Sequence, residues 1–123
     1  MANTDSKNKA LIISNLALEK KAEDVKILDM QRVAAFCDYF VIAGAGSLKH
    51  GGAIASHIKD SLAKQRIRAY HSEGKADNQW ILLDYADVIV HIFQEDIRRF
   101  YDLERLWGDA KQVDISAGIK SGA

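Results

Sequence analysis

The sequence predicts an α/β fold in which a mixed β-sheet is flanked by helices. Three observations predict it: an N-terminal stretch whose apolar residues fall at helical spacing, several short runs rich in β-branched and aromatic residues, and glycines that punctuate the chain between them. With 123 residues the chain is long enough for one domain with a real core and too short for two. The expected order of elements is α-β-β-α-β-β-β-α, an α/β sandwich.

The first half of the chain predicts two helices and two strands. Apolar residues at helical spacing indicate an amphipathic helix over about residues 9–20. Residues 25–30 and 39–44 are short apolar runs, which predict the first two strands. Ser47 is well placed to cap a second helix that begins near Leu48 and ends near Gln65.

The second half predicts the rest of the sheet. Residues 68–73 indicate a third strand, residues 80–93 a β-hairpin, and residues 96–107 a last helix. The final stretch lacks periodicity and ends in small and polar residues. We therefore expect a single domain over residues 1–109 and a mobile C-terminal tail over residues 110–123.

Charge and cysteine content exclude several classes of protein. The 17 basic residues balance the 17 acidic ones, so no global field draws the chain to nucleic acid or to a membrane surface. The single cysteine, Cys37, leaves no disulfide framework and no thiolate zinc site. No apolar run approaches the roughly 18 residues that span a bilayer, and the first residues do not resemble a targeting segment. We expect a cytoplasmic protein whose partner meets a local patch.

The glycine-rich turn from Gly44 to Gly52 lies where a strand meets a helix, a place where backbone N–H groups can hold phosphate. It matches neither the P-loop nor the dinucleotide pattern. A strand-Gly-Ser-helix unit resembles nucleotidyltransferases, but those enzymes carry paired carboxylates on the following strand, where residues 68–73 offer only Glu73. We expect no catalytic residues, metal or cofactor. A nucleotide-binding or nucleotidyltransferase-type enzyme that uses this turn is the alternative.

Other reactive side chains have ordinary explanations. His50 and His57 are seven residues apart on the predicted helix, too far for one metal ion, so a solvated helix face accounts for them better. Cys37 has no nearby Ser/His/Asp arrangement, and we expect a small buried or half-buried thiol rather than a nucleophile.

The predicted hairpin, WILLDYADVIVHIF, separates apolar from mixed side chains. A two-residue turn centred on Tyr85 and Ala86 would place Asp84 opposite Asp87 and Trp80 opposite His91. Because side chains alternate between faces, one face is purely aliphatic and belongs to the core: Ile81, Leu83, Val88, Val90 and Ile92. The other face resembles a protein-interaction surface, unless a helix covers it; it holds Trp80, Leu82, Asp84, Asp87, Ile89 and His91. A Tyr-Ala centre suits a two-residue turn poorly, and a longer turn would shift the register.

Four strings together resemble the ribosomal silencing factor family, also called Iojap-like proteins. They are DYFVI at residues 38–42, EG at 73–74, WILLDYADVIVHIF at 80–93 and RRFYDLERLWGDA at 98–110. The resemblance covers about residues 9–110. It implies an α/β domain related to the nucleotidyltransferase fold that lacks the catalytic carboxylates, and therefore a protein that is not an enzyme.

The resemblance also implies a partner and a mechanism. Family members bind the large ribosomal subunit through the ribosomal protein L-fourteen, block small-subunit joining, and slow translation when nutrients are short. A homodimer would compete with that contact, and no specific nucleic-acid readout is expected. On this chain the expected ribosomal-protein-binding residues are Glu73, Trp80, Leu82, Asp84, Tyr85, Asp87 and His91.

Three positions depart from the family pattern. Ala86 stands where the family usually has Gly, Lys49 where it usually has Arg, and Gly51 where it usually has a bulky aliphatic residue. The change at Ala86 puts a turn with positive φ in doubt at that position. Lys49 keeps the charge but loses the planar fork of Arg, so we give that turn little weight as a contact.

Overall fold

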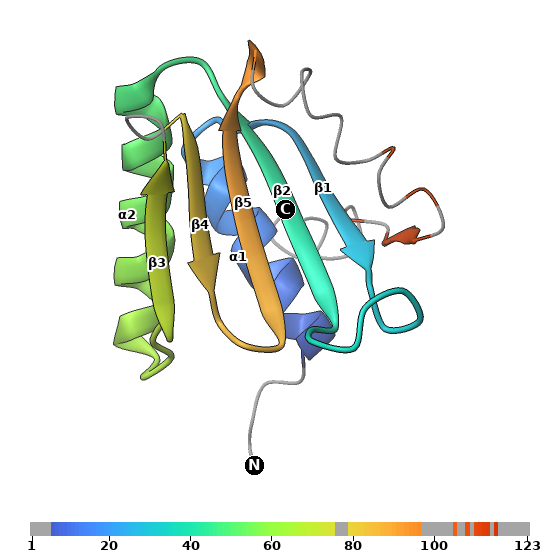
Figure 1. Ribbon diagram of the computed structural model, residues 1–123. Helices are drawn as coiled ribbons and strands as arrows, with labels where there is room; N and C mark the ends of the chain where they lie inside the picture. Colours follow the sequence, from blue (N-terminus) through green and yellow to red (C-terminus); the bar gives the residue numbers. More distant parts are fainter. Residues whose placement is uncertain are drawn as a thin grey trace.

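A computed structural model describes residues 6–75, 79–96, 105, 108, 110–113 and 115. In chain order its elements are α1(Ser6–Glu19), β1(Glu23–Asp29), β2(Tyr39–Ala45), α2(Leu48–Lys64), β3(His71–Lys75), β4(Trp80–Asp84), β5(Val88–Gln94) and β6(Lys111–Val113). The strands form one six-stranded sheet in the order β3-β4-β5-β2-β1-β6. The pair β2 and β5 is parallel and the other neighbours are antiparallel (Figure 1). The predicted mixed sheet with flanking helices is confirmed.

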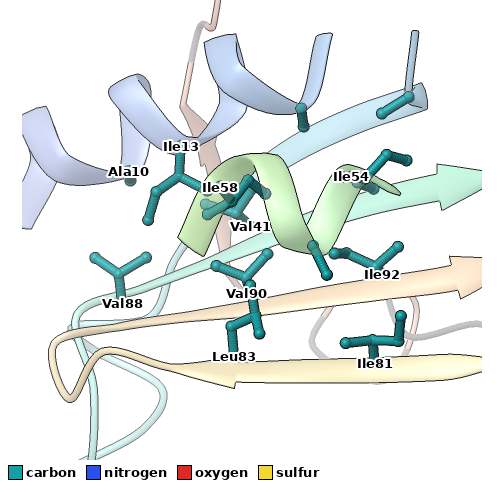
Figure 2. Close-up of a cluster of buried hydrophobic side chains, with 14 of the residues drawn as sticks. Ala10, Ile13, Val41, Ile54, Ile58, Ile81, Leu83, Val88, Val90 and Ile92 are labelled. Atoms are coloured by element: carbon teal, nitrogen blue, oxygen red, sulfur yellow. The ribbon is translucent and has the colours of Figure 1, made fainter. Parts of the chain in front are cut away.

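Both helices lie on the same face of the sheet, behind the strands in Figure 1. α1 buries Ala10, Ile13 and Ala17, and α2 buries residues four apart, Ile54, Ile58 and Leu62. Side chains at these spacings share one face of a helix. They pack on the aliphatic side chains that alternate along β2, β4 and β5, as Figure 2 shows for Val41, Leu83 and Val90. Each fully buried large aliphatic side chain contributes about 1.5–3 kcal/mol.

The ends of the two helices follow local capping rules. The Ser47 hydroxyl accepts a hydrogen bond from the N–H of His50 at 3.0 Å, which confirms the predicted N-cap of α2. At the other end of α2 the N–H of Ile67 donates to Leu62 O, beside Arg66 with φ of 65°. This is a Schellman motif in which an arginine occupies the position that usually favours glycine.

The hairpin forms where predicted, but its predicted register is wrong. Trp80 lies opposite Phe93 rather than His91, and Asp84 lies opposite Ile89 rather than Asp87. The turn is longer than two residues: it runs over residues 85–87 and is closed by a hydrogen bond from Tyr85 N–H to Val88 O at 2.9 Å. A shift of two positions, from 91 to 93, leaves every strand side chain on its predicted face. The two aspartates are therefore not opposed in the sheet.

Two further elements differ from the prediction. β3 begins at His71 rather than residue 68, so Gly74 belongs to the strand and pairs with Ile81. The expected mobile tail is wrong for Lys111–Val113, which form β6 and extend the sheet beside β1, with Val113 opposite Ile27. The predicted helix over residues 96–107 lies almost entirely outside the described residues. Within the part of the chain that is described, no helix is long and apolar enough to cross a membrane.

Candidate functional site

The sheet face opposite α1 and α2 carries the mixed side chains that the hairpin predicted. We call it the aromatic face and define it by side chains on four neighbouring strands: Phe40, Glu73, Trp80, Leu82, Asp84, Ile89, His91 and Phe93. It is the face turned toward the reader in Figure 1. The strict alternation of the strands separates it from the aliphatic face, which packs on the helices.

A hydrogen bond between two aromatic side chains lies near the centre of this face. The indole Nε1–H of Trp80 donates to Nδ1 of His91 at 3.2 Å. The ring of Phe40 meets the His91 ring edge-on with centroids 4.6 Å apart, and Phe93 lies 4.8 Å from Trp80. Because Nδ1 accepts, the neutral ring carries its proton on Nε2, which has no hydrogen-bond partner in the described part of the chain. Burial lowers the pKa of His91 to about 4, so the ring is neutral at pH 7.

Four of the predicted site residues are half-buried and border this centre. Trp80 and Leu82 supply apolar surface, while Glu73 and Asp84 supply carboxylates. Glu73 Oε2 lies 3.0 Å from Nε2 of His71, its neighbour on the same strand face. His91 belongs to the same face but is only 5% exposed, so its contribution is the hydrogen bond that it accepts from Trp80. The structure thus brings together five of the seven predicted residues.

The other two predicted residues lie elsewhere, because the turn is longer than expected. Tyr85 is 3% exposed and packs in the aliphatic cluster beneath the helices. Asp87 pairs with Nζ of Lys9 on α1 at 2.8 Å. The backbone oxygen of Asp87 also accepts hydrogen bonds from the N–H groups of Asp38 and Tyr39. Tyr85 and Asp87 therefore fasten the turn to its surroundings and do not belong to the aromatic face.

Phe36, an exposed aromatic residue beside this face, was not predicted from the sequence. Phe36 is 63% exposed and lies in the connection between β1 and β2, where Val33 is also exposed. The Phe36 ring lies 6.3 Å from that of Phe40, centroid to centroid, so it continues the aromatic series beyond the strands. The sequence did offer a signal for Phe36. It is an aromatic residue in a predicted loop, four positions before Phe40, whose side chain lies on the outward-facing side of the next strand.

The turn from Gly44 to Gly52 gives little support to phosphate binding. The N–H of Gly46 already donates to Nδ1 of His50 at 2.9 Å. The cleft beside the turn is bordered by the acidic residues Glu23, Glu95 and Asp96, which would repel a phosphate. No group of three or more His, Cys, Asp or Glu that could hold a metal ion occurs among the described residues. These contacts disfavour the nucleotide alternative.

The histidines of α2 have structural partners at the end of α1. His50 Nε2 donates to the backbone oxygen of Lys20 at 2.7 Å, since its Nδ1 is an acceptor. His57 Nε2 lies 2.7 Å from Glu19 Oε1. Both hydrogen bonds are exposed, which agrees with the predicted solvated helix face, and they also connect α2 to the end of α1 and the residue that follows it.

The cysteine agrees with the prediction. Cys37 is buried, and burial, followed by the carboxylates of Asp38, Asp84 and Asp87, raises the pKa of its thiol to about 11. A thiol that stays protonated at neutral pH is a poor nucleophile.

A family model described as "Ribosomal silencing factor during starvation" matches residues 3–122 of this sequence. The chain belongs to this family. A ribosomal silencing factor of Bacillus subtilis is 42% identical over 101 residues, which cover 82% of this chain and 86% of that relative. The chloroplastic Iojap protein of Zea mays is 35% identical over 106 residues, covering 86% of this chain and 46% of that longer relative.

Solved structures agree with this assignment. A protein from Bacillus halodurans matches with a TM-score of 0.76 and 34% identity, covering 89% of this chain and 99% of the other. A protein from Chromobacterium violaceum matches with a TM-score of 0.81 and 25% identity, covering 85% and 88%. The family expected from the sequence strings is confirmed, together with the mixed α/β fold.

Proposed function

We propose that this silencing factor binds the large ribosomal subunit through the ribosomal protein L-fourteen and blocks small-subunit joining. The observation that carries the proposal is the half-exposed pair Trp80 and Leu82, bordered by the carboxylates of Glu73 and Asp84, on a chain of the ribosomal silencing factor family. Such a block is steric and requires affinity and placement but no reaction. Translation then falls when nutrients are short, and the protein acts in the cytoplasm.

The chemistry of the aromatic face defines the partner it suits. A partly exposed tryptophan beside a leucine is typical of the apolar centre of an interface, where a few residues carry most of the binding energy. The carboxylates at the edge favour a partner with basic residues around an apolar centre. A homodimer that used the same face would compete with ribosome binding.

Two substitutions test the contact without touching the buried centre. Leu82→Ser removes half-exposed apolar surface, and Glu73→Lys reverses one charge at the edge. We expect each to weaken co-sedimentation with purified large subunits by about tenfold, since interface residues of this kind contribute about 1–2 kcal/mol. Trp80→Ala is less informative, because it also removes the bond to His91.

The matched control is Asp60→Lys, the same type of charge reversal at an exposed position of α2 on the opposite side of the sheet. It should sediment like the unmodified protein. Normal sedimentation of Leu82→Ser and Glu73→Lys would remove the aromatic face from the proposal. Equal loss of binding in the two charge reversals, Glu73→Lys and Asp60→Lys, would point to a non-specific charge effect instead.

A further inference from the structure

A cleft lies under the C-terminal half of α2, on the helix side of the sheet and away from the aromatic face. Its volume is about 340 Å³, in the range of small-molecule sites. Lining residues come from α2, from the connection to β3, from β3 and from the hairpin turn: Lys59, Asp60, Ala63, Arg68, Ala69, Ser72 and Tyr85. Side chains from the end of α2, from β3 and from the hairpin turn therefore meet at one concave surface.

The polar groups of this cleft are mostly hydrogen-bond donors. Lys59 and Arg68 supply two cations, while Ser72 and Tyr85 supply hydroxyl groups. Asp60 is the one carboxylate of the lining, so the cleft has a net positive charge. The ion pairs seen between described residues leave the amino group of Lys59 and the guanidinium of Arg68 unused. These cations and hydroxyl donors suit an anionic ligand.

A buried hydroxyl supplies an independent observation. The Tyr85 Oη is inaccessible to solvent and has no hydrogen-bond partner within the described chain. Burial raises the pKa of Tyr85 to about 12, so the group stays protonated and can act as a donor. An unsatisfied buried donor costs free energy in the unliganded protein, and a ligand oxygen would remove that cost. Because the hydroxyl is covered, a ligand that lies in the cleft reaches it only after a neighbouring side chain moves.

We propose that this cleft binds the phosphate group of a small organic phosphate. Lys59 and Arg68 pair with the anion, and the hydroxyl of Tyr85 donates to one of its oxygens. A phosphate dianion uses two cations and additional donors more fully than a single carboxylate does. Ala63 and Ala69 offer apolar surface for the organic part of the ligand. The site is separate from the ribosome contact, so either proposal can fail alone.

The test is a titration of the ¹⁵N-labelled full chain with glycerol 3-phosphate at constant ionic strength, followed by amide chemical shifts. Acetate and sodium chloride serve as parallel titrants. We expect saturable shifts at Ala69, Ser72 and Tyr85 with a dissociation constant of about 1–10 mM or tighter. Acetate should bind at least fivefold more weakly, and chloride should give no saturable change.

Variants then assign the contact. Tyr85→Phe removes only the hydroxyl and should weaken phosphate binding about tenfold, while Lys59→Gln should weaken it about fivefold. Asp60→Asn should tighten it, because a competing carboxylate is lost. The matched control, Lys64→Gln, changes an exposed lysine of the same helix that does not line the cleft, and should bind unchanged.

The buried hydroxyl of Tyr85 should also affect stability in the absence of ligand. Tyr85→Phe should raise the thermal midpoint by roughly 2–6 °C, since it deletes an unsatisfied buried group. A lower midpoint would mean that the hydroxyl has a partner in the folded protein and would overturn its role as a ligand donor. The proposed site would be overturned if glycerol 3-phosphate gave no saturable shifts. It would also be overturned if Tyr85→Phe and Lys64→Gln weakened glycerol 3-phosphate binding equally.

Discussion

The two faces of the sheet are built from the same strands and differ in almost every physical property. On the aliphatic face, side chains such as Leu83 and Val90 are completely buried against the helices. On the aromatic face, Trp80 and Leu82 are only half-buried, and the centre contains a hydrogen-bonded histidine. The aliphatic face gains stability from burial alone. The aromatic face combines stability with surface that a partner can cover.

This difference shows how a short chain can stabilise itself and still present an interface. Every second residue of β4 belongs to the core. The residues between these core positions can therefore contact a partner without any loss of core side chains. The hydrogen bond from Trp80 to His91 then fixes the orientation of the indole. A rigid aromatic anchor loses little conformational entropy on binding, which favours affinity.

The strongest contrast between the faces should appear in two neighbouring leucines. Leu83→Ala should lower the free energy of unfolding by about 3 kcal/mol or more, because it opens a cavity in a fully buried cluster. Leu82→Ala should lower it by about 1 kcal/mol or less, since its side chain is half-exposed. Urea denaturation measures both values. Equal losses would mean that the aromatic face is buried as completely as the aliphatic one.

The buried histidine should give the aromatic face a pH dependence. Its pKa in the folded protein is about 4, whereas an unfolded histidine has a pKa near 6.5. Between these values the unfolded chain binds more protons, so stability is fully present above pH 6.5, falls as the pH drops toward 4, and then levels off. The loss approaches roughly 3 kcal/mol, because a pKa difference of one unit corresponds to about 1.4 kcal/mol. Urea denaturation at several pH values measures it.

His91→Gln isolates this contribution, because glutamine does not titrate and can still accept from Trp80. The difference in unfolding free energy between the unmodified protein and this variant should change with pH between 6.5 and 4. His57→Gln is the control at the interface of the two helices, and it should retain the pH dependence that His91 causes. A pH dependence that survives in His91→Gln would assign it to the carboxylates instead.

The faces themselves could be predicted from the sequence, and the turn between the strands could not. Alternation along residues 80–93 placed Ile81, Leu83 and Trp80 correctly, because a strand has a period of two whatever its register. The length of the turn depends on backbone angles that a Tyr-Ala-Asp string does not reveal. Because the turn is longer than predicted, Tyr85 and Asp87 lie outside the expected site.

Other differences arise from contacts between distant segments. The strand β6 forms because its backbone pairs with the free edge of β1, and the composition of Lys111–Val113 carries no sign of that pairing. Likewise, Lys9 is 78 residues from Asp87 in sequence, so no local pattern could predict their ion pair. The periodicity of a segment predicts which of its side chains are buried. The segment or side chain that it contacts depends on the tertiary fold.

The turn between β4 and β5 should give the smallest effect, and a substitution there should stabilise the protein. Ala86 has φ of 73°, in the left-handed region that its side chain disfavours, and its N–H donates to Asp84 Oδ1 at 2.7 Å. The positive φ that the Ala86 departure had put in doubt is therefore present.

Ala86→Gly should raise the free energy of unfolding by about 1 kcal/mol, because glycine adopts this angle without the steric cost. Ala53→Gly, at an exposed helical position of α2, makes the same chemical change and should lower it by about 1 kcal/mol. Urea denaturation measures the change in unfolding free energy for both variants. A gain at residue 86 with a loss at residue 53 would show that the strain lies in the turn. A loss at both positions would contradict it.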